Sequence, residues 1–243
     1  MLLFMMLILS FANGKKIDLS YPYDEDTAYW IPSDIPFRFI KKTANVDDGY
    51  WYAANQFETA EHCGTHLDAP YHFNKLGWKV DEIPLDRLIT TGVFLNASLE
   101  TNGNCSFTLS TKELEKWENQ NGEFPNNSVL LISFGWASRY NNKTEYFGPS
   151  SDKLCFPGLS KEAAEWITKS EKIVGVGVDT PSTDQGLNVE AHLELTSKNL
   201  YLLENLAIIH PLPNRNFTVY SLPMKIKNGT GGPCRIVADL STL

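Results

Sequence analysis

The sequence predicts an α/β fold, a single domain with a central mixed β-sheet and few helices. Short apolar runs of strand-forming residues recur along the chain, whereas helix-start signals are few. No linker or internal repeat divides the 243 residues. The composition, with 42% hydrophobic and 21% charged residues, is that of a chain with an ordinary packed core.

The first predicted element is a signal peptide over residues 1–14. The run from Leu2 to Phe11 is almost entirely apolar, too short to span a bilayer and of the right length for the core of a signal peptide. Small residues follow at plausible cleavage positions, although no Lys or Arg precedes the run. A buried N-terminal strand or helix is the alternative. We therefore expect a mature domain over residues 15–243, secreted or in the lumen of the secretory pathway.

Six acceptor motifs for N-glycosylation agree with export. They predict surface positions, because a glycan cannot be buried. The asparagines are Asn96, Asn104, Asn126, Asn142, Asn216 and Asn228.

The remaining elements are expected in the following order. Residues 21–39, rich in proline and aromatic residues, should form turns and short extended pieces. Ser110 and Glu113 form a capping box that opens a helix through about Glu118, and Ser160 caps a second helix. Apolar runs predict strands over residues 92–95, 129–134, 173–178, 206–209 and 235–238. The continuous runs at 129–134 and 173–178 are typical of strands buried on both faces.

The net charge limits the classes of binding partner, and the cysteines are read together with the predicted export. A net charge of −8 without a basic run makes nucleic acid and anionic membranes poor partners, so a small-molecule substrate is expected. No later hydrophobic stretch would anchor the protein in a membrane after signal cleavage. In an exported chain the four cysteines predict one disulfide, with three full pairings open.

The segment over residues 61–72 carries potential metal ligands at His62, His66, Asp68 and His72. On a helix, Asp68 would lie about 240° around the axis from His62, at about 100° per residue. In an extended chain all four even-numbered side chains project to one face. The spacing therefore predicts an extended row of ligands. Cys63 should face the opposite way into packing, which leaves it out of the disulfide.

Imidazoles with a carboxylate suit zinc, manganese or ferrous iron. The alternative is that each histidine satisfies a local hydrogen bond. Catalytic sites usually need another protein ligand and a position for water, and His192 and Glu204 are the candidates. Glu204 ends an apolar run, where a carboxylate is costly to bury unless it is paired or coordinated, although a helix-end or ion-pair role is also open. His210 is expected to be structural.

The string His62-Cys-Gly-Thr-His66-Leu-Asp68-Ala-Pro-Tyr-His72 resembles the HxGTHxDxPxH signature of the cyclase-like metal-dependent hydrolases, which include bacterial-type kynurenine formamidase and isatin hydrolase. The resemblance covers most of the mature chain and implies a swivelling β/β/α-like fold. Other similar blocks are Tyr29-Trp30-Ile-Pro-Ser-Asp-Ile-Pro-Phe, with one residue more between Trp and Pro, Phe156-Pro-Gly-Leu-Ser, Gly177-Val-Asp-Thr-Pro-Ser, Glu204-Asn-Leu and Gly232-Pro-Cys-Arg-Ile-Val-Ala.

The resemblance also implies roles for individual residues. The formamidase pattern implies two adjacent metals, usually zinc, with His62, His66 and Asp68 on the first. His192 then fits the second metal, and Asp68 and Glu204 bridge both. The isatin-hydrolase branch has Gln where this chain has Glu204 and works with a single manganese. One or two divalent ions are therefore expected, with zinc favoured.

The same pattern makes His72 the acid/base and places Trp30 against the substrate's aromatic ring. We expect a bound metal to lower the pKa of water to about 7, and the hydroxide to attack an amide carbonyl. With N-formyl-L-kynurenine, as in tryptophan catabolism, the products would be L-kynurenine and formate.

Three other functions remain open at this stage. One is a ring-opening hydrolase of a cyclic amide or lactone, another a secreted metal- or ligand-binding protein without catalysis, and the third an adhesive or structural glycoprotein. The family's tendency to dimerise also implies a homodimer.

Overall fold

The structure is a computed structural model that describes residues 15–30, 35–47 and 49–242. The strands are β1 Lys16–Asp18, β2 Arg38–Asp47, β3 Tyr50–Glu58, β4 His66–Asp68, β5 Ile89–Asn96, β6 Thr108–Leu109, β7 Ser128–Ser133, β8 Gly158–Leu159, β9 Ile173–Val178, β10 Tyr201–Glu204, β11 Phe217–Pro223 and β12 Gly231–Asp239. The α-helices are α1 Leu85–Leu88, α2 Ser98–Thr101, α3 Thr111–Asn121, α4 Lys143–Phe147, α5 Lys161–Ser170 and α6 Glu190–Ser197. Single 3-10 turns are η1 Pro70–His72, η2 Ala137–Arg139 and η3 Leu240–Thr242.

The main sheet is mixed and closes on itself. Its order is β1-β12-β11-β5-β7-β9-β10-β4, and β12 also pairs with β4. The run β5-β7-β9-β10 is parallel, while β4, β11 and β12 pair antiparallel with their neighbours. The predicted α/β domain with a central mixed sheet is therefore confirmed. Its closure into a barrel-like sheet was not predicted.

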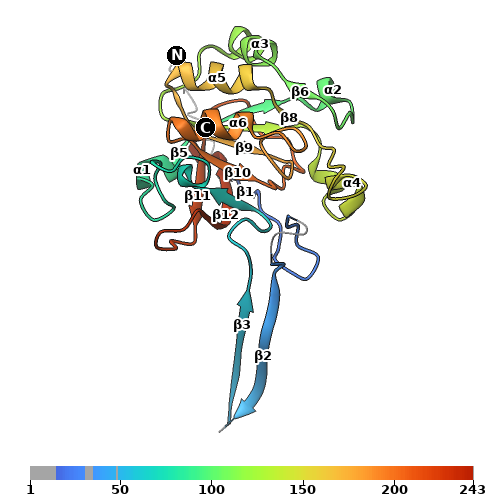
Figure 1. Cartoon of the computed structure of the whole chain (residues 1–243). Coiled ribbons are helices and arrows are strands. Elements are labelled where there is room, and N and C mark those ends of the chain that lie inside the picture. The colour runs from blue at the N-terminus through green and yellow to red at the C-terminus, as the bar shows by residue number, and fades with distance from the viewer. Residues whose placement is uncertain (1–14, 31–34, 48, 243) are drawn as a thin grey trace, which may run out of the picture.

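Two apolar cores lie on the two faces of this sheet. Val129 and Leu131 of β7 belong to the cluster inside the closed sheet, together with inward residues of the other strands. Leu130 and Ile132 belong to the second cluster, with side chains of α3 and α5. Figure 1 shows α3, α5 and α6 gathered on one side of the sheet. Burial on both faces explains the continuous apolar runs of β7 and β9.

The predicted helices and most predicted strands are present. α3 begins with the predicted capping box of Ser110 and Glu113, and the Ser160 side chain caps α5. The strand predicted at 206–209 is wrong. There the chain makes scattered backbone hydrogen bonds, from Leu206 to Val178 and from Ala207 to Leu19, so apolar burial in a loop produces the same sequence pattern as a strand.

Strands β2 and β3 form a two-stranded hairpin, the arm, which projects from the body (Figure 1). Turns and short extended pieces were predicted for residues 21–39. The described residues 21–30 and 35–37 agree with this, whereas Arg38 and Phe39 begin β2. The exposed hairpin was not predicted, because it lacks the apolar alternation that marks a half-buried strand. Its exposed aromatic side chains include Trp51, which is 66% exposed.

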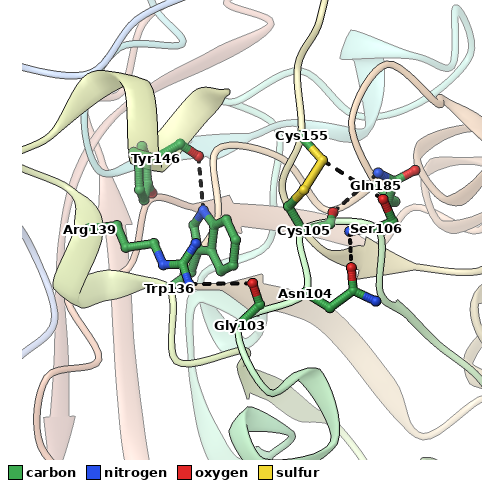
Figure 2. The surroundings of a disulfide bond; sticks show 9 residues. All are labelled: Gly103, Asn104, Cys105, Ser106, Trp136, Arg139, Tyr146, Cys155 and Gln185. Carbon is green, nitrogen blue, oxygen red and sulfur yellow. Dashed lines mark hydrogen bonds between the residues drawn. A yellow bond between two sulfur atoms is a disulfide. The ribbon is translucent and has the colours of Figure 1, made fainter. Parts of the chain in front are cut away.

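A disulfide joins Cys105 and Cys155 across a sequence separation of 50 residues (Figure 2). Cys63 and Cys234 are both buried, in agreement with leaving Cys63 out of the disulfide. The Gln185 side chain donates a hydrogen bond to the Cys105 carbonyl (3.3 Å), and the Gly186 N–H donates to the Phe156 carbonyl (3.3 Å). The cross-link thus holds together two segments that support the loop around residue 185.

The structure describes the six predicted glycosylation sites but not the predicted signal peptide. All six asparagines of the acceptor motifs are exposed, as a glycan requires. The predicted signal peptide at residues 1–14 lies outside the described residues. Within the described part of the chain, no helix has both the length and the apolar character that crossing a membrane requires.

Candidate metal centre

Strand β4 is the base of the candidate site. It is only three residues long and lies between β10 and β12, with His66 opposite Glu204 in the register and Asp68 opposite Gly231. Leu67 points into the core inside the closed sheet. His66 and Asp68 therefore point to the other face, toward α6.

The chain before β4 turns sharply. Gly64 has a φ of +62°, and a Cβ there would lie 2.8 Å from Thr27 and 2.9 Å from Tyr23, so the turn needs glycine. The Gly64 carbonyl then accepts a hydrogen bond from His66 Nδ1 (2.9 Å). This turn brings His62 back onto Asp68, with Nδ1 2.6 Å from Asp68 Oδ1.

The predicted extended row of ligands is therefore wrong outside β4. His62 lies in the turn and His72 ends η1, which begins at Pro70. Both side chains still reach the same site as His66 and Asp68. The backbone bends at the turn and in η1 direct both side chains to the site, whereas the prediction assumed one extended chain with its even-numbered side chains on one face.

Helix α6 supplies His192 from far along the chain. Asp184, in the loop before the helix, accepts hydrogen bonds from the backbone N–H groups of Ala191 (2.7 Å) and His192 (2.9 Å). The same carboxylate lies 2.6 Å from His192 Nδ1. One aspartate thus caps the start of α6 and fixes the direction of the imidazole.

Glu204 ends β10 next to β4. Its Oε1 accepts a hydrogen bond from the backbone N–H of Thr183 (2.8 Å) and lies 3.3 Å from His192 Nε2. Its Oε2 lies 3.6 Å from His66 Nε2. Glu204 is 2% exposed, so it is a buried carboxylate that faces histidines.

Asp68 lies at the centre of these side chains. Its Oδ1 is 3.1 Å from His66 Nε2, and its Oδ2 is 3.3 Å from His192 Nε2. Two groups of potential ligand atoms share this aspartate, each within 4.8 Å. The groups are His62, Asp68 and His72, and His66, Asp68 and Glu204.

The protons on these rings show that the site fits a cation. His66 Nδ1 donates to a carbonyl and His192 Nδ1 donates to a carboxylate, which leaves the Nε2 atom of each ring as an acceptor when the ring is neutral. Both then face the oxygens of Asp68 and Glu204, which are also acceptors. His66 Nε2 is fully buried and has no hydrogen-bond partner among the described residues. A divalent ion would suit this set of acceptors as a common partner.

In the metal-free protein, protons on His66 and His192 supply part of the positive charge that the buried carboxylates attract. Burial lowers the pKa of His66, but Asp68, Glu204 and the Gly64 carbonyl outweigh it and raise the pKa to about 9. Burial also opposes the charged form of His192, yet hydrogen bonds to Asp184, Asp68 and Glu204 raise its pKa well above the usual value. Burial raises the pKa of Asp68, but the nearby histidines lower it well below the usual value.

His72 has a different environment. Its ring stacks on His62 with the centroids 4.0 Å apart and lies 6.3 Å from the His192 ring. Burial lowers the pKa of His72, and although Asp68 raises it, His62 and His192 lower it further, to about 4. The ring is therefore neutral at neutral pH and can accept a proton.

A cavity of about 290 Å³ opens over these residues. Trp30 lines it and makes edge contacts with Phe147 and Phe156, each with centroids 6.1 Å apart. The other wall is formed by Phe73 and by the loop over residues 186–189. Aromatic and aliphatic walls above a polar floor suit a small aromatic substrate.

Most predicted site residues line this cavity, and others were missed. The metal-site candidates, His72 and Trp30 all line it, whereas His210 is exposed. The roles of Asp184, the Thr183 backbone and Phe73 were not predicted. A carboxylate eight residues before His192 was the available signal for Asp184, since metal-binding histidines usually donate to a carboxylate or carbonyl.

Comparison with known proteins shows similarity to hydrolases over most of the chain. The Cyclase family model matches residues 17–185. The chain is 28% identical to isatin hydrolase of Roseibium aggregatum, over 84% of each chain. It is also 28% identical to kynurenine formamidase of Bacillus anthracis, over 93% of this chain and 97% of that one.

Solved structures of isatin hydrolases have the same fold as this chain. Isatin hydrolase A from Labrenzia aggregata, bound to benzyl benzoate, superposes with a TM-score of 0.86 at 28% identity, covering 94% of each chain. An isatin hydrolase bound to the product analogue thioisatinate gives 0.85 at 25% identity, covering 93% of this chain and 92% of that one. With its closed mixed sheet and its convergent histidines and carboxylates, this chain belongs to the Cyclase family of metal-dependent hydrolases.

Proposed function

We propose that this protein hydrolyses an amide bond of a small aromatic substrate, as an arylformamidase that converts N-formyl-L-kynurenine into L-kynurenine and formate. The observation that supports this most directly is the set of buried acceptors on the floor of the cavity, next to a neutral histidine. The relatives named kynurenine formamidase, at 28% identity over nearly the whole chain, support the substrate.

The residues would divide the work as follows. His62, His66, Asp68, His192 and Glu204 would hold one or two divalent ions, which polarise a carbonyl and acidify water. Zinc is the favoured ion, because imidazole and carboxylate ligands suit it, with manganese as the other candidate. The carboxylates of Asp68 and Glu204 each face more than one histidine, which supports two ions.

His72 would move the proton. Its neutral ring accepts a proton from the attacking water while the new C–O bond forms, and returns it to the nitrogen as the C–N bond breaks. Positioned proton transfer of this kind typically contributes about 10²–10⁴-fold. Trp30 and Phe73 would hold the aromatic ring of the substrate and keep bulk water away from the carbonyl.

The test is turnover by purified protein, before and after chelation and after zinc or manganese is returned, with metal analysis of each sample. We expect N-formyl-L-kynurenine to be hydrolysed only when metal is present. Full activity in metal-free protein, or no turnover in the metal-loaded protein, would exclude the proposal.

Ring opening is the second candidate, and the isatin-hydrolase structures with TM-scores of 0.85 and 0.86 favour it. A cyclic amide or lactone needs the same attack at a carbonyl, but both products stay in one molecule. Isatin in the same assay distinguishes the two reactions by the ratio of kcat/KM. A protein that binds metal but turns over neither substrate would instead be a non-catalytic binding protein.

We further propose that the protein is exported and glycosylated. The support is the apolar run at residues 2–11, the six acceptor motifs, whose asparagines are exposed, and the Cys105–Cys155 disulfide. Digestion with an N-glycosidase should lower the apparent mass of protein from a eukaryotic secretory host. An unchanged mass would contradict glycosylation.

A homodimer through the arm is proposed as well. An isolated hairpin is at best marginally stable in water, and this one exposes Ile40, Tyr50, Trp51, Tyr52 and Phe57. The arm stands clear of its own body (Figure 1), so a second copy can cover it. Light scattering should give twice the chain mass for the wild type and a monomer for Trp51→Ser with Ile40→Ser; a monomeric wild type would contradict the proposal.

A further inference from the structure

A chain of hydrogen bonds leads from His62 away from the metal site toward the surface. His62 Nε2 lies 2.9 Å from Thr230 Oγ1. The Thr230 hydroxyl donates to Glu61 Oε2 (2.6 Å), and the Thr230 backbone N–H donates to the same oxygen (2.8 Å). Glu61 and Thr230 have no part in the division of work proposed above.

The donors and acceptors in this chain fix where the His62 proton lies. A carboxylate only accepts, so the single hydrogen of the Thr230 hydroxyl is used by Glu61. Thr230 Oγ1 must then accept at its other contact, and His62 Nε2 must carry the hydrogen. The other nitrogen, Nδ1, donates its hydrogen to Asp68 Oδ1 (2.6 Å) in the metal-free protein, and it is the nitrogen that an ion beside Asp68 would take in place of that hydrogen.

We infer that Thr230 and Glu61 are positioning residues, which hold the His62 proton on Nε2 and so present Nδ1 to the metal. The inference rests on the proposed function, because it requires that His62 binds an ion. It assigns to His62 the same kind of outer partner that Asp184 gives His192 and the Gly64 carbonyl gives His66.

The surroundings of the ring support a fixed orientation. The Gly231 backbone lies against His62, and a Cβ there would be 2.7 Å from His62 Cε1. His72 stacks on the His62 ring, with the centroids 4.0 Å apart. The ring therefore has a stacked neighbour, a close backbone at Cε1 and a hydrogen bond at Nε2, and its Nδ1 points at Asp68 in the site.

The test compares zinc affinity, measured by chelator competition, in the wild type, Thr230→Val and Thr230→Ser. Valine keeps the shape of the side chain without the hydroxyl, so we expect zinc to bind about 10–100-fold more weakly. Serine keeps the hydroxyl and should restore the affinity to within a few fold. Equal affinity in the valine variant, or no recovery with serine, would overturn the inference.

A spectroscopic measurement separates positioning from folding. Long-range ¹H–¹⁵N spectra of the zinc-loaded wild type should show the His62 proton on Nε2. A proton on Nδ1 would overturn the inference even if Thr230→Val weakens binding. A wild type that binds no zinc would instead contradict the proposed function, so the two failures are distinguishable.

Two control variants complete the design. Thr230→Val also removes the acceptor motif of Asn228, and Asn228→Gly removes that motif while the hydroxyl stays; glycine tolerates the φ of +62° there. Thr218→Val makes the same change on β11, where Thr218 pairs with Thr91 and Asp239. Both controls should bind zinc as the wild type does, and a loss in Asn228→Gly equal to that in Thr230→Val would refute the role of the hydroxyl.

Discussion

His66 and His72 lie in the same pocket, but the groups around them differ. Asp68 and Glu204 lie within 3.6 Å of His66 Nε2, and they raise the pKa of His66 to about 9. Burial and neighbouring histidines lower the pKa of His72 to about 4. The first environment attracts a cation, and the second keeps a ring neutral for proton transfer.

The residue-scale prediction is that their alanine variants fail differently. His66→Ala should lose bound metal, because it removes a buried ligand from between two carboxylates. His72→Ala should keep its metal and lose about 10²–10⁴-fold in kcat. Metal analysis and steady-state kinetics measure this, and identical behaviour of the two variants would show the division of roles to be wrong.

The raised pKa of His66 also predicts how the metal-free protein responds to pH. A pKa raised from about 6.5 to about 9 gives stability that is fully present below about pH 6.5 and is lost as the pH rises through about 9. For this buried group the loss is about 3 kcal/mol. Urea unfolding of chelated protein between pH 6.5 and 9 measures it. His66→Ala is the control that should lack this loss, and equal slopes in both proteins would refute the assignment.

At the scale of elements, one residue in the loop before α6 both stabilises the start of the helix and orients a metal-site histidine. Asp184 accepts two backbone N–H groups at the start of α6 and holds the His192 ring. Asp184→Asn should weaken metal binding about 10–100-fold, because an amide competes poorly for the Nδ1 proton. Asn still accepts at a helix start, so the fold should be retained. Chelator competition and circular dichroism check the two parts, and unchanged affinity would contradict the role.

The Cys105–Cys155 disulfide braces the same loop through the Gln185 and Phe156 contacts. Closing a loop of this size in the unfolded chain contributes about 4 kcal/mol in the chain-entropy model, and about 2–4 kcal/mol is typical. The double variant Cys105→Ser/Cys155→Ser should unfold at lower denaturant by about this free energy. Reductant should destabilise the wild type and leave the double variant unchanged; a reductant effect on both would point to the other cysteines.

At the scale of the whole molecule, the site joins elements that meet only in the folded state. β4 and β10 contribute ligands from the sheet, and α6 contributes another from the layer above it. Zinc at about 100 times its Kd should therefore stabilise the protein by about 2.7 kcal/mol, because it binds the folded state. Thermal unfolding with and without zinc measures the shift, and His66→Ala should show little of it.

The sequence by itself determined the local features. These are the capping box of α3, the Ser160 cap of α5, the doubly buried strands β7 and β9, and the candidate ligands within residues 61–72, all of which depend on neighbours a few residues away. Spacing and side-chain chemistry report such features directly. The match of residues 62–72 to a hydrolase signature added the roles of His192 and Glu204, which spacing alone left open.

Only the tertiary structure decided how distant segments meet. Closure of the sheet places β4 between β10 and β12, and the turn at Gly64 brings His62 onto Asp68, where an extended row was expected. Hydrogen bonds to histidines define the roles of Asp184 and Thr230, and Glu61 acts through Thr230. Thr230 lies 168 residues along the chain from its partner His62. The physical reason is that a hydrogen bond or a coordination sphere depends on distance in space, which sequence spacing fixes only within one element.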